Sequence, residues 1–140
     1  MKYILLTLLI LFVNANAQEI AIASQVKGSV SAKSADKTIS ITSGSTLNSG
    51  MVLITKKDAS VTVIFKDNSK LVLGSNALLS LKKFVFKPTE EKYDFQLFLE
   101  KGSASFESGK ISQLSPEDFV FKTPEATVAI RGTKFFVKVQ

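Results

Sequence analysis

The chain has 140 residues and a formal net charge of +6, and it contains neither cysteine nor histidine. Disulfide bonds and thiol nucleophiles are therefore excluded, and the commonest general base and the soft metal ligands are missing. The carboxylate pairs Glu90-Glu91 and Glu117-Asp118 are adjacent in sequence, and neighbours on a strand face opposite sides, so neither makes a convergent acid–base pair. We expect no enzyme: no catalytic residue, no metal site and no cofactor.

The first seventeen residues follow the order of a secretory signal peptide. A lysine at position 2 precedes an apolar run over residues 4–13, and residues 15–17 have the form A-x-A. A bilayer-spanning helix needs about 20 apolar residues, so this run is too short to remain as an anchor. We expect residues 1–17 to be removed after Ala17 and residues 18–140 to be a periplasmic domain, not a lipoprotein because no cysteine is present. The alternative is an uncleaved anchor.

The charge of the exported part is basic. All acidic residues and all but one of the basic residues lie beyond residue 17, which leaves a net charge of about +5, nearly all from lysine. A solvated lysine surface that aids solubility is the simpler interpretation. The same charge would attract anionic envelope polymers, such as lipopolysaccharide or acidic glycans, so weak association with them is expected. Nucleic acid is not expected as a partner, because no recognition motif is present.

Beyond residue 17, apolar and polar side chains alternate with period two, which predicts short β-strands. The apolar positions of the clearest strands are Val61, Val63 and Phe65; Phe95, Leu97 and Leu99; Phe119 and Phe121; Ala126, Val128 and Ile130; and Phe135, Val137 and Val139. Turn-forming residues separate the strands, at 43–45, 49–50, 67–69, 74–76, 101–103 and 108–109. The sequence predicts a small, all-β single domain that is β-solenoid-like, with a β-sandwich or barrel as the alternative.

One short segment has helical character. Ser115 resembles a helix cap, Pro116 suits the first helical position, and Glu117 and Asp118 are acids of a first turn. Pro124 follows soon after, and the residues between are strand-like. We therefore predict at most one helical turn here.

Four segments carry a resemblance to a known family. They are VKGSV at 26–30, GxxLxxGxxxIT at 44–55, ASVTVIFKDNSxLxLG at 59–74 and FxFxTPxAxVxIRGTxFxV at 119–137. Together they resemble the FecR-like domain, the periplasmic part of iron-dicitrate transport regulators, over residues 26–139. Asn68 stands where that family usually has glycine, and asparagine also tolerates a left-handed turn. The resemblance implies a small β-solenoid-like or sandwich-like domain.

The rest of a regulator is not matched. Regulators of that family carry a sigma-factor-binding region and a membrane helix before this domain, and they continue past the Arg-Gly-Thr strand. Here export begins at Met1 and the chain stops at Gln140. We therefore expect no direct sigma-factor contact.

The candidate structural or binding motif comprises Thr123, Pro124, Arg131, Gly132 and Thr133. Arg131 is a single arginine among many lysines, and its planar guanidinium can hold a carboxylate or two carbonyl groups in fixed geometry. One interpretation is a contact with an anion or with a partner's carboxylate. The other is a structural clamp across a turn, in which Gly132 adopts a backbone conformation that other residues avoid.

Two functions are consistent with these features. The first is a protein-interaction or sensory accessory module that docks on an envelope protein, such as the extracytoplasmic part of a membrane sensor, through exposed strand edges. The second is a binder of anionic envelope polymers. Tryptophan is absent and phenylalanine mostly occupies core-alternating positions, which disfavours an aromatic platform for carbohydrate. Salt separates the two, because lysine-led polymer binding weakens steeply with ionic strength.

Overall fold

The structure is a computed structural model that describes residues 18–129 and 134–140. The expected signal peptide, residues 1–17, lies outside the described residues. None of the described helices combines the length and apolar character that a bilayer span requires.

The described residues form twelve strands with three short helical segments. The strands are β1 (Glu19–Lys27), β2 (Val30–Ser34), β3 (Lys37–Ser40), β4 (Thr46–Asn48), β5 (Val52–Thr55), β6 (Ser60–Phe65), β7 (Lys70–Leu73), β8 (Leu78–Lys87), β9 (Lys92–Glu107), β10 (Phe119–Lys122), β11 (Thr127–Val128) and β12 (Lys134–Val139). The helical segments are the 3-10 turn η1 (Pro88–Glu90), the one-turn helix α1 (Ile111–Leu114) and the 3-10 turn η2 (Pro116–Asp118).

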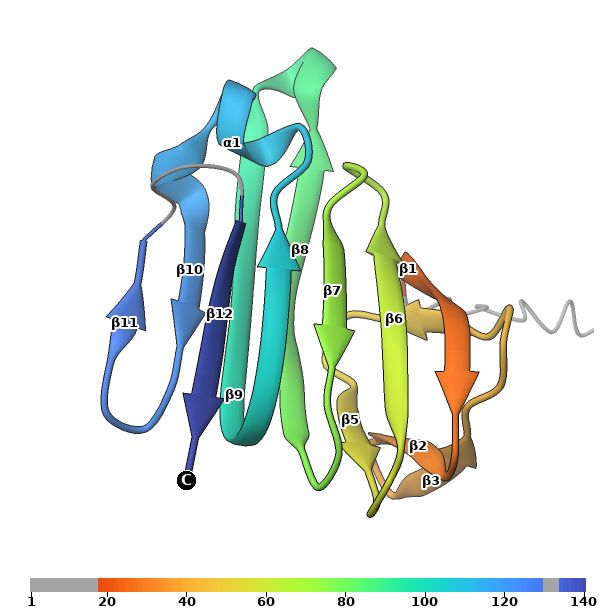
Figure 1. Cartoon of the computed structure of the whole chain (residues 1–140). Coiled ribbons are helices and arrows are strands. Elements are labelled where there is room, and N and C mark those ends of the chain that lie inside the picture. Colours follow the sequence, from red (N-terminus) through yellow and green to blue (C-terminus); the bar gives the residue numbers. More distant parts are fainter. Residues whose placement is uncertain (1–17, 130–133) are drawn as a thin grey trace, which may run out of the picture.

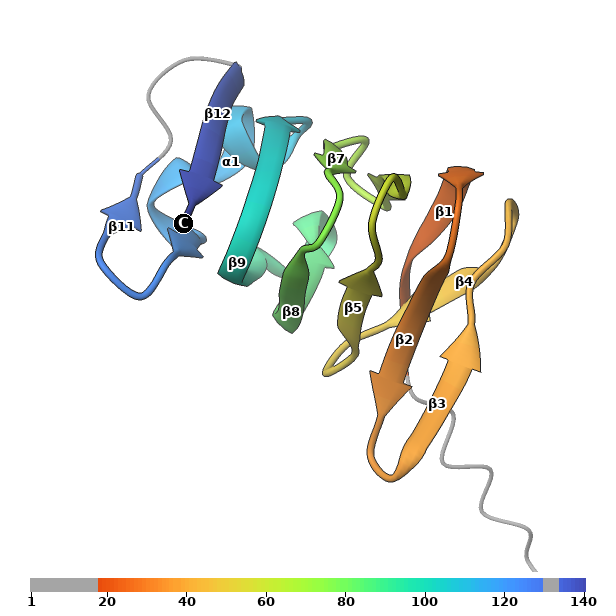
Figure 2. The ribbon, with the colours of Figure 1, turned by 60° about the horizontal axis from the view of Figure 1, so that its bottom comes forward.

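The strands make one curled sheet whose two layers share β9 (Figures 1 and 2). The front layer contains β4, β1, β6, β7, the second half of β9, and β12. The back layer contains β3, β2, β5, β8, the first half of β9, β10 and β11. Among the described strands, every pair is antiparallel except β9 with β10.

A glycine turns β9 from one layer into the other. Gly102 has φ +93°, and a Cβ atom built there would lie 2.4 Å from the Ala77 Cβ and 2.6 Å from the Ala77 Cα. Only glycine fits both this conformation and this close approach. The sequence predicted a turn at 101–103, and the bend is found there, although hydrogen bonding continues through it as one long strand.

The alternating apolar residues meet between the two layers. The Phe65 ring of the front layer lies 4.8 Å from the ring of Phe95 in the back layer. Phe106 of the front layer stacks on Phe119 of the back layer at 4.7 Å. Removing one such buried ring costs about 3–5 kcal/mol. One phenylalanine-rich core therefore holds the layers together, and Phe135 of β12 packs against its edge.

The all-β prediction is confirmed, in the form of a small domain with a curled, antiparallel sheet. A β-solenoid-like coil is not confirmed by this topology. The single helical turn expected near Pro116 is present as η2, whereas α1 was not predicted. Asn68 has φ +68°, the left-handed conformation expected for it.

Candidate functional site

The back layer ends in a small hairpin formed by β10 and β11. The backbone N–H of Thr123 donates to the Ala126 carbonyl oxygen at 2.9 Å. The N–H of Ala126 donates to the Thr123 hydroxyl oxygen at 3.0 Å. Pro124 follows in the turn, at the position where its fixed φ is favoured and no N–H is needed. Thr123 and Pro124 therefore shape the hairpin, which is a structural role.

The other three residues of the predicted motif, Arg131, Gly132 and Thr133, lie outside the described residues. The structure brings Thr123 and Pro124 into one turn and leaves both interpretations of Arg131 as predictions.

The front layer ends in β12, which pairs with the second half of β9. Its side chains alternate: Phe135, Val137 and Val139 face inward and are partly buried, while those at 134, 136 and 138 are exposed. In the described residues β12 pairs only with β9, and β11 pairs only with β10. Each layer therefore ends, on the same side of the molecule, in a strand with one unpaired edge.

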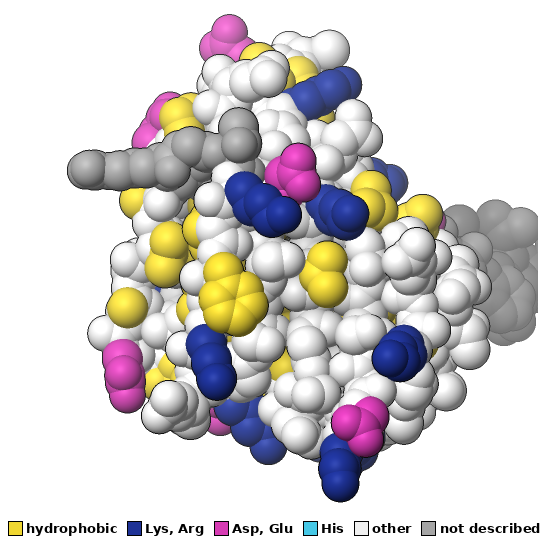
Figure 3. All heavy atoms as spheres, viewed as in Figure 1, with side chains coloured by type: hydrophobic (Ala, Val, Ile, Leu, Met, Phe, Trp, Pro, Cys, Tyr) yellow, Lys and Arg dark blue, Asp and Glu magenta, His cyan; other side chains and the backbone are white. Residues whose placement is uncertain are grey.

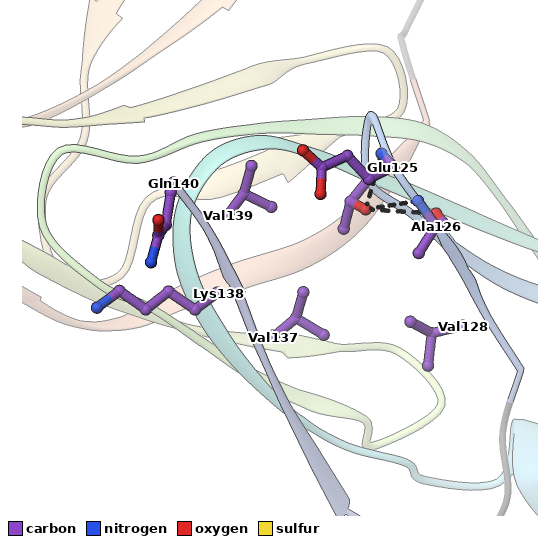
Figure 4. Close-up of a pocket in the computed structure, with 8 residues that line it drawn as sticks. Glu125, Ala126, Val128, Val137, Lys138, Val139 and Gln140 are labelled. Carbon is purple, nitrogen blue, oxygen red and sulfur yellow. Dashed lines mark hydrogen bonds between the residues drawn. The ribbon is translucent and has the colours of Figure 1, made fainter.

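A hollow of about 360 Å³ lies between these two strands, and we call it the seam groove. It is lined by Thr123, Glu125, Ala126, Val128, Val137, Lys138, Val139 and Gln140. Figure 4 shows Val128 of β11 and Val137 of β12 directed toward one another, with Lys138 directed away. The floor is thus apolar and comes from both layers, whereas Glu125, Thr123 and Gln140 provide polar groups at the rim.

The most deeply buried polar cluster is elsewhere, at the turn between β6 and β7. Asp67 and Ser69 are fully buried. The Asp67 carboxylate accepts hydrogen bonds from the Ser69 hydroxyl at 2.7 Å and from the Ile111 N–H at 3.1 Å. The Ser69 hydroxyl oxygen accepts the Gly109 N–H at 2.9 Å. Every partner belongs to the chain itself, so this cluster ties the turn to the segment after β9 and is structural.

A second, more open hollow of about 560 Å³ gathers acids that are distant in sequence, Glu91 with Glu117 and Asp118, beside Tyr93. Ser115 donates its hydroxyl to the Asp118 carboxylate at 2.5 Å and to that of Glu117 at 3.1 Å. Across residues 18–129 and 134–140, no three His, Cys, Asp or Glu side chains are grouped closely enough to hold a metal ion.

Fold and groove define a small all-β module with an open strand edge at one end. The family model described as "FecR protein" matches residues 51–140, so the chain belongs to the FecR family. That match covers β5 to β12 and includes the whole seam groove, whereas the resembling segment at 26–30 lies before it.

No curated protein matches the chain. Among solved structures, a "Cell surface anchoring domain" is 23% identical, with a TM-score of 0.45, and the alignment covers 46% of this chain and 87% of that one.

The apolar residues of the seam groove could be predicted from the sequence, but the groove itself could not. The alternation had already put Val128, Val137 and Val139 at apolar strand positions. It did not show that β11 and β12 end different layers, because strand pairing depends on contacts between distant segments.

Proposed function

We propose that the protein is an exported, non-enzymatic interaction module of the cell envelope, and that it receives an extended strand of a partner protein at the seam groove. One observation carries the proposal: in the part of the chain that the structure describes, two unpaired strand edges, β11 and β12, lie on either side of a groove to which both layers contribute valine side chains. Membership of the FecR family supports an extracytoplasmic location.

Strand addition suits this geometry. The free edge of β12 presents backbone N–H and C=O groups at alternate residues, and a partner strand would pair with them. Each such hydrogen bond contributes about 0.5–1.5 kcal/mol net. Alternate apolar side chains of the partner strand would enter the groove beside Val128 and Val137. The volume of the groove, about 360 Å³, is sufficient for them. Backbone pairing would supply affinity and the groove would select side chains.

Export is the second element of the proposal and has its own test. The intact mass of the protein, purified from the cells that make it, is expected to begin at Gln18. Recovery only from membranes, with residues 1–17 still attached, would contradict export by a cleaved signal.

The strand-addition proposal is tested by crosslinking in the cell. A photo-reactive benzoyl-phenylalanine replaces Val139 in the groove or, as the control, Thr38 on exposed β3 at the far end of the sheet. We expect a discrete protein adduct from position 139 and none from position 38. Filling the groove with Val128→Arg should abolish the adduct while the melting temperature stays close to that of the parent.

The partner recovered in that adduct is then purified and added to the protein. Strand addition predicts slower hydrogen exchange at the β12 amides, little changed by added salt, because backbone pairing is weakly screened. Equal adducts from positions 139 and 38, or an adduct that survives groove filling, would refute docking at the seam groove. A partner that forms the adduct without protecting β12 would refute the strand-addition mode.

A further inference from the structure

The outer surface of the front layer carries exposed apolar and cationic side chains together, and we call it the front face. The pairing of β12, β9 and β7 defines rows of residues that lie opposite one another across this face. Phe136 of β12 lies opposite Ser105 of β9, which lies opposite Val72 of β7. In the next row Lys134 lies opposite Glu107, which lies opposite Lys70. Figure 3 shows hydrophobic and lysine side chains gathered over β12, β9 and β7 on this face.

Phe136 is the least buried large hydrophobic side chain of the described residues, with an exposed fraction of 67%. Its neighbour Phe135 points the opposite way and contacts the rings of Phe106 and Phe121 at 5.5 and 5.4 Å. Val72 is half-buried two strands away. The Phe136 ring, with Val72 near it in the same row, is therefore free to contact a partner surface.

Three lysines surround this ring. Lys134 and Lys138 flank Phe136 on the same side of β12, each about 7 Å along the strand, and Lys70 lies two strands away in the row of Lys134, at about 12 Å from Phe136. The ion pairs found in the described residues, Lys83–Asp94 and Lys87–Glu90, involve neither these lysines nor this layer. Glu107 is the one acid within the row. The local excess is therefore positive, which favours an anionic partner over a neutral one.

The shape of the face decides between partners. The hollow lined in part by Lys70, Glu107 and Lys134 measures about 50 Å³, and another on β1 and β6, lined in part by Ile22 and Ile64, measures about 210 Å³. Both are below the roughly 300–1,000 Å³ of a pocket for a small molecule. Beside Phe136 on β9 lie Ser103 and Ser105, which are only partly exposed, and phenylalanine has no polar group with which to orient a sugar. A cationic surface that has only small hollows and carries one exposed aromatic ring suits an anionic interface instead.

We propose that the front face docks on the surface of an anionic lipid bilayer. Phe136 enters the boundary between headgroups and acyl chains, and Lys70, Lys134 and Lys138 lie beside the headgroup phosphates. This site uses the opposite face of β12 from the seam groove, and only Lys138 borders both: β12 presents Val137 and Val139 to the groove and Phe136 to the bilayer. A protein held in this way keeps its strand edge free for a partner at the membrane surface.

The chain has no tryptophan, so Phe136→Trp gives a single emitting group on the front face. The mature protein is mixed with vesicles of phosphatidylglycerol and phosphatidylcholine in equal amounts, or of phosphatidylcholine alone. We expect a blue shift of the emission with the anionic vesicles only, reversed by high salt. The matched control is Ile39→Trp on β3, a position 39% exposed on the other layer, which should show no shift.

Charge is tested by vesicle sedimentation. Each lysine near an anionic surface is worth about a fivefold change in affinity, so Lys134→Gln with Lys138→Gln should weaken binding by roughly 25-fold. Lys33→Gln with Lys37→Gln, which removes the same charge from the back layer, should change binding less than about twofold. Phe136→Ser should also weaken binding, while the crosslink from position 139 to a protein partner persists.

Three outcomes would overturn the proposal. An equal loss of vesicle affinity in the two double-lysine variants would mean that net charge alone causes binding. An unshifted emission from the vesicle-bound Phe136→Trp variant would mean that the aromatic ring does not enter the bilayer. Binding to a soluble acidic polysaccharide, with no binding to anionic vesicles, would assign the front face to a glycan.

Discussion

The two ends of the curled sheet place strands of opposite layers beside one another, but they close differently. At the first end, the chain between β3 and β4 crosses from the back layer to the front and fills the gap. Ile41 is 3% exposed there, and its N–H donates to the Val30 carbonyl oxygen at 2.9 Å. The Gly44 N–H donates to the Ala23 carbonyl oxygen at 2.7 Å. A side chain and backbone hydrogen bonds seal this end.

At the second end, β11 and β12 also belong to opposite layers, and the seam groove lies between them. Within residues 18–129 and 134–140 no fully buried side chain fills the space between the layers here, as Ile41 does at the first end. Val128, Val137 and Val139 are only partly buried. The edge strands differ as well: β3 is short, exposed and polar, which protects an edge from pairing, whereas β12 presents valines inward. The same two-layer construction can therefore be completed by its own chain or left open for another.

The largest expected effect comes from breaking the bend that joins the two layers. Gly102→Ala forces a Cβ atom against Ala77 and should cost about 4 kcal/mol or more, close to the whole stability of a marginal domain. Gly50→Ala is the matched control, because Gly50 has a similar φ of +87° but open space around it, and it should cost about 1 kcal/mol. Urea unfolding measures both. Equal costs would mean that the close approach to Ala77 is not the constraint.

The next effect tests the difference between the two ends directly. Ile41→Ala should lower the free energy of unfolding by about 2–5 kcal/mol, because it empties a fully packed site. Val137→Ala, at the open end, should cost less than about 1 kcal/mol, because its side chain already contacts solvent. Denaturant midpoints of the two variants decide the matter. If Val137→Ala costs as much as Ile41→Ala, the second end is sealed in solution.

A smaller effect is expected at the hairpin that carries β11. Thr123→Val removes the hydroxyl oxygen that accepts the Ala126 N–H and should cost about 0.5–1.5 kcal/mol. The loss should be local, so hydrogen exchange at Val128 should accelerate while the amides of β6 are unchanged. Thr123→Ser, which keeps the acceptor, is the control. Uniform acceleration across the sheet would contradict a local role.

The smallest effect concerns Arg131. A bidentate clamp should lose measurable stability in Arg131→Lys, about 1 kcal/mol, because an ammonium cannot reproduce the guanidinium fork. Thermal unfolding measures this. An unchanged melting temperature, combined with loss of the crosslink from position 139, would instead assign Arg131 to the binding surface.

The alternation of apolar residues predicted the inward faces of β6 and β10, but it was wrong at Ala126, which is exposed in the turn before β11. Val61, Val63 and Phe65 are buried on β6, and Phe119 and Phe121 on β10, as the period of two requires. The conformation of Asn68 was also predicted, because its left-handed turn depends on local sterics. Local rules were sufficient wherever the determining contact lies within a few residues.

Contacts between distant segments could not be predicted in the same way. Asp67 was expected in a turn, but its burial depends on Ile111, 44 residues later. The two halves of β9 lie in different layers, and this bend depends on the close approach of Gly102 to Ala77. Phe136 is different, because adjacent phenylalanines on a strand must face opposite sides. The adjacent pair Phe135-Phe136 therefore implies that one of the two rings is exposed, and this exposed ring could have been predicted from the sequence.

The shared strand β9 also sets the order in which the protein can fold. A chain made from its N-terminus supplies β1 to β8 first, and neither layer can be joined to the other until β9 has formed past Gly102. Until residue 107 emerges, the apolar faces of β6 and β8 have no completed core in which to pack. The two layers therefore come together late, and a chain that still lacks β9 exposes the most apolar surface and is the form most prone to aggregate.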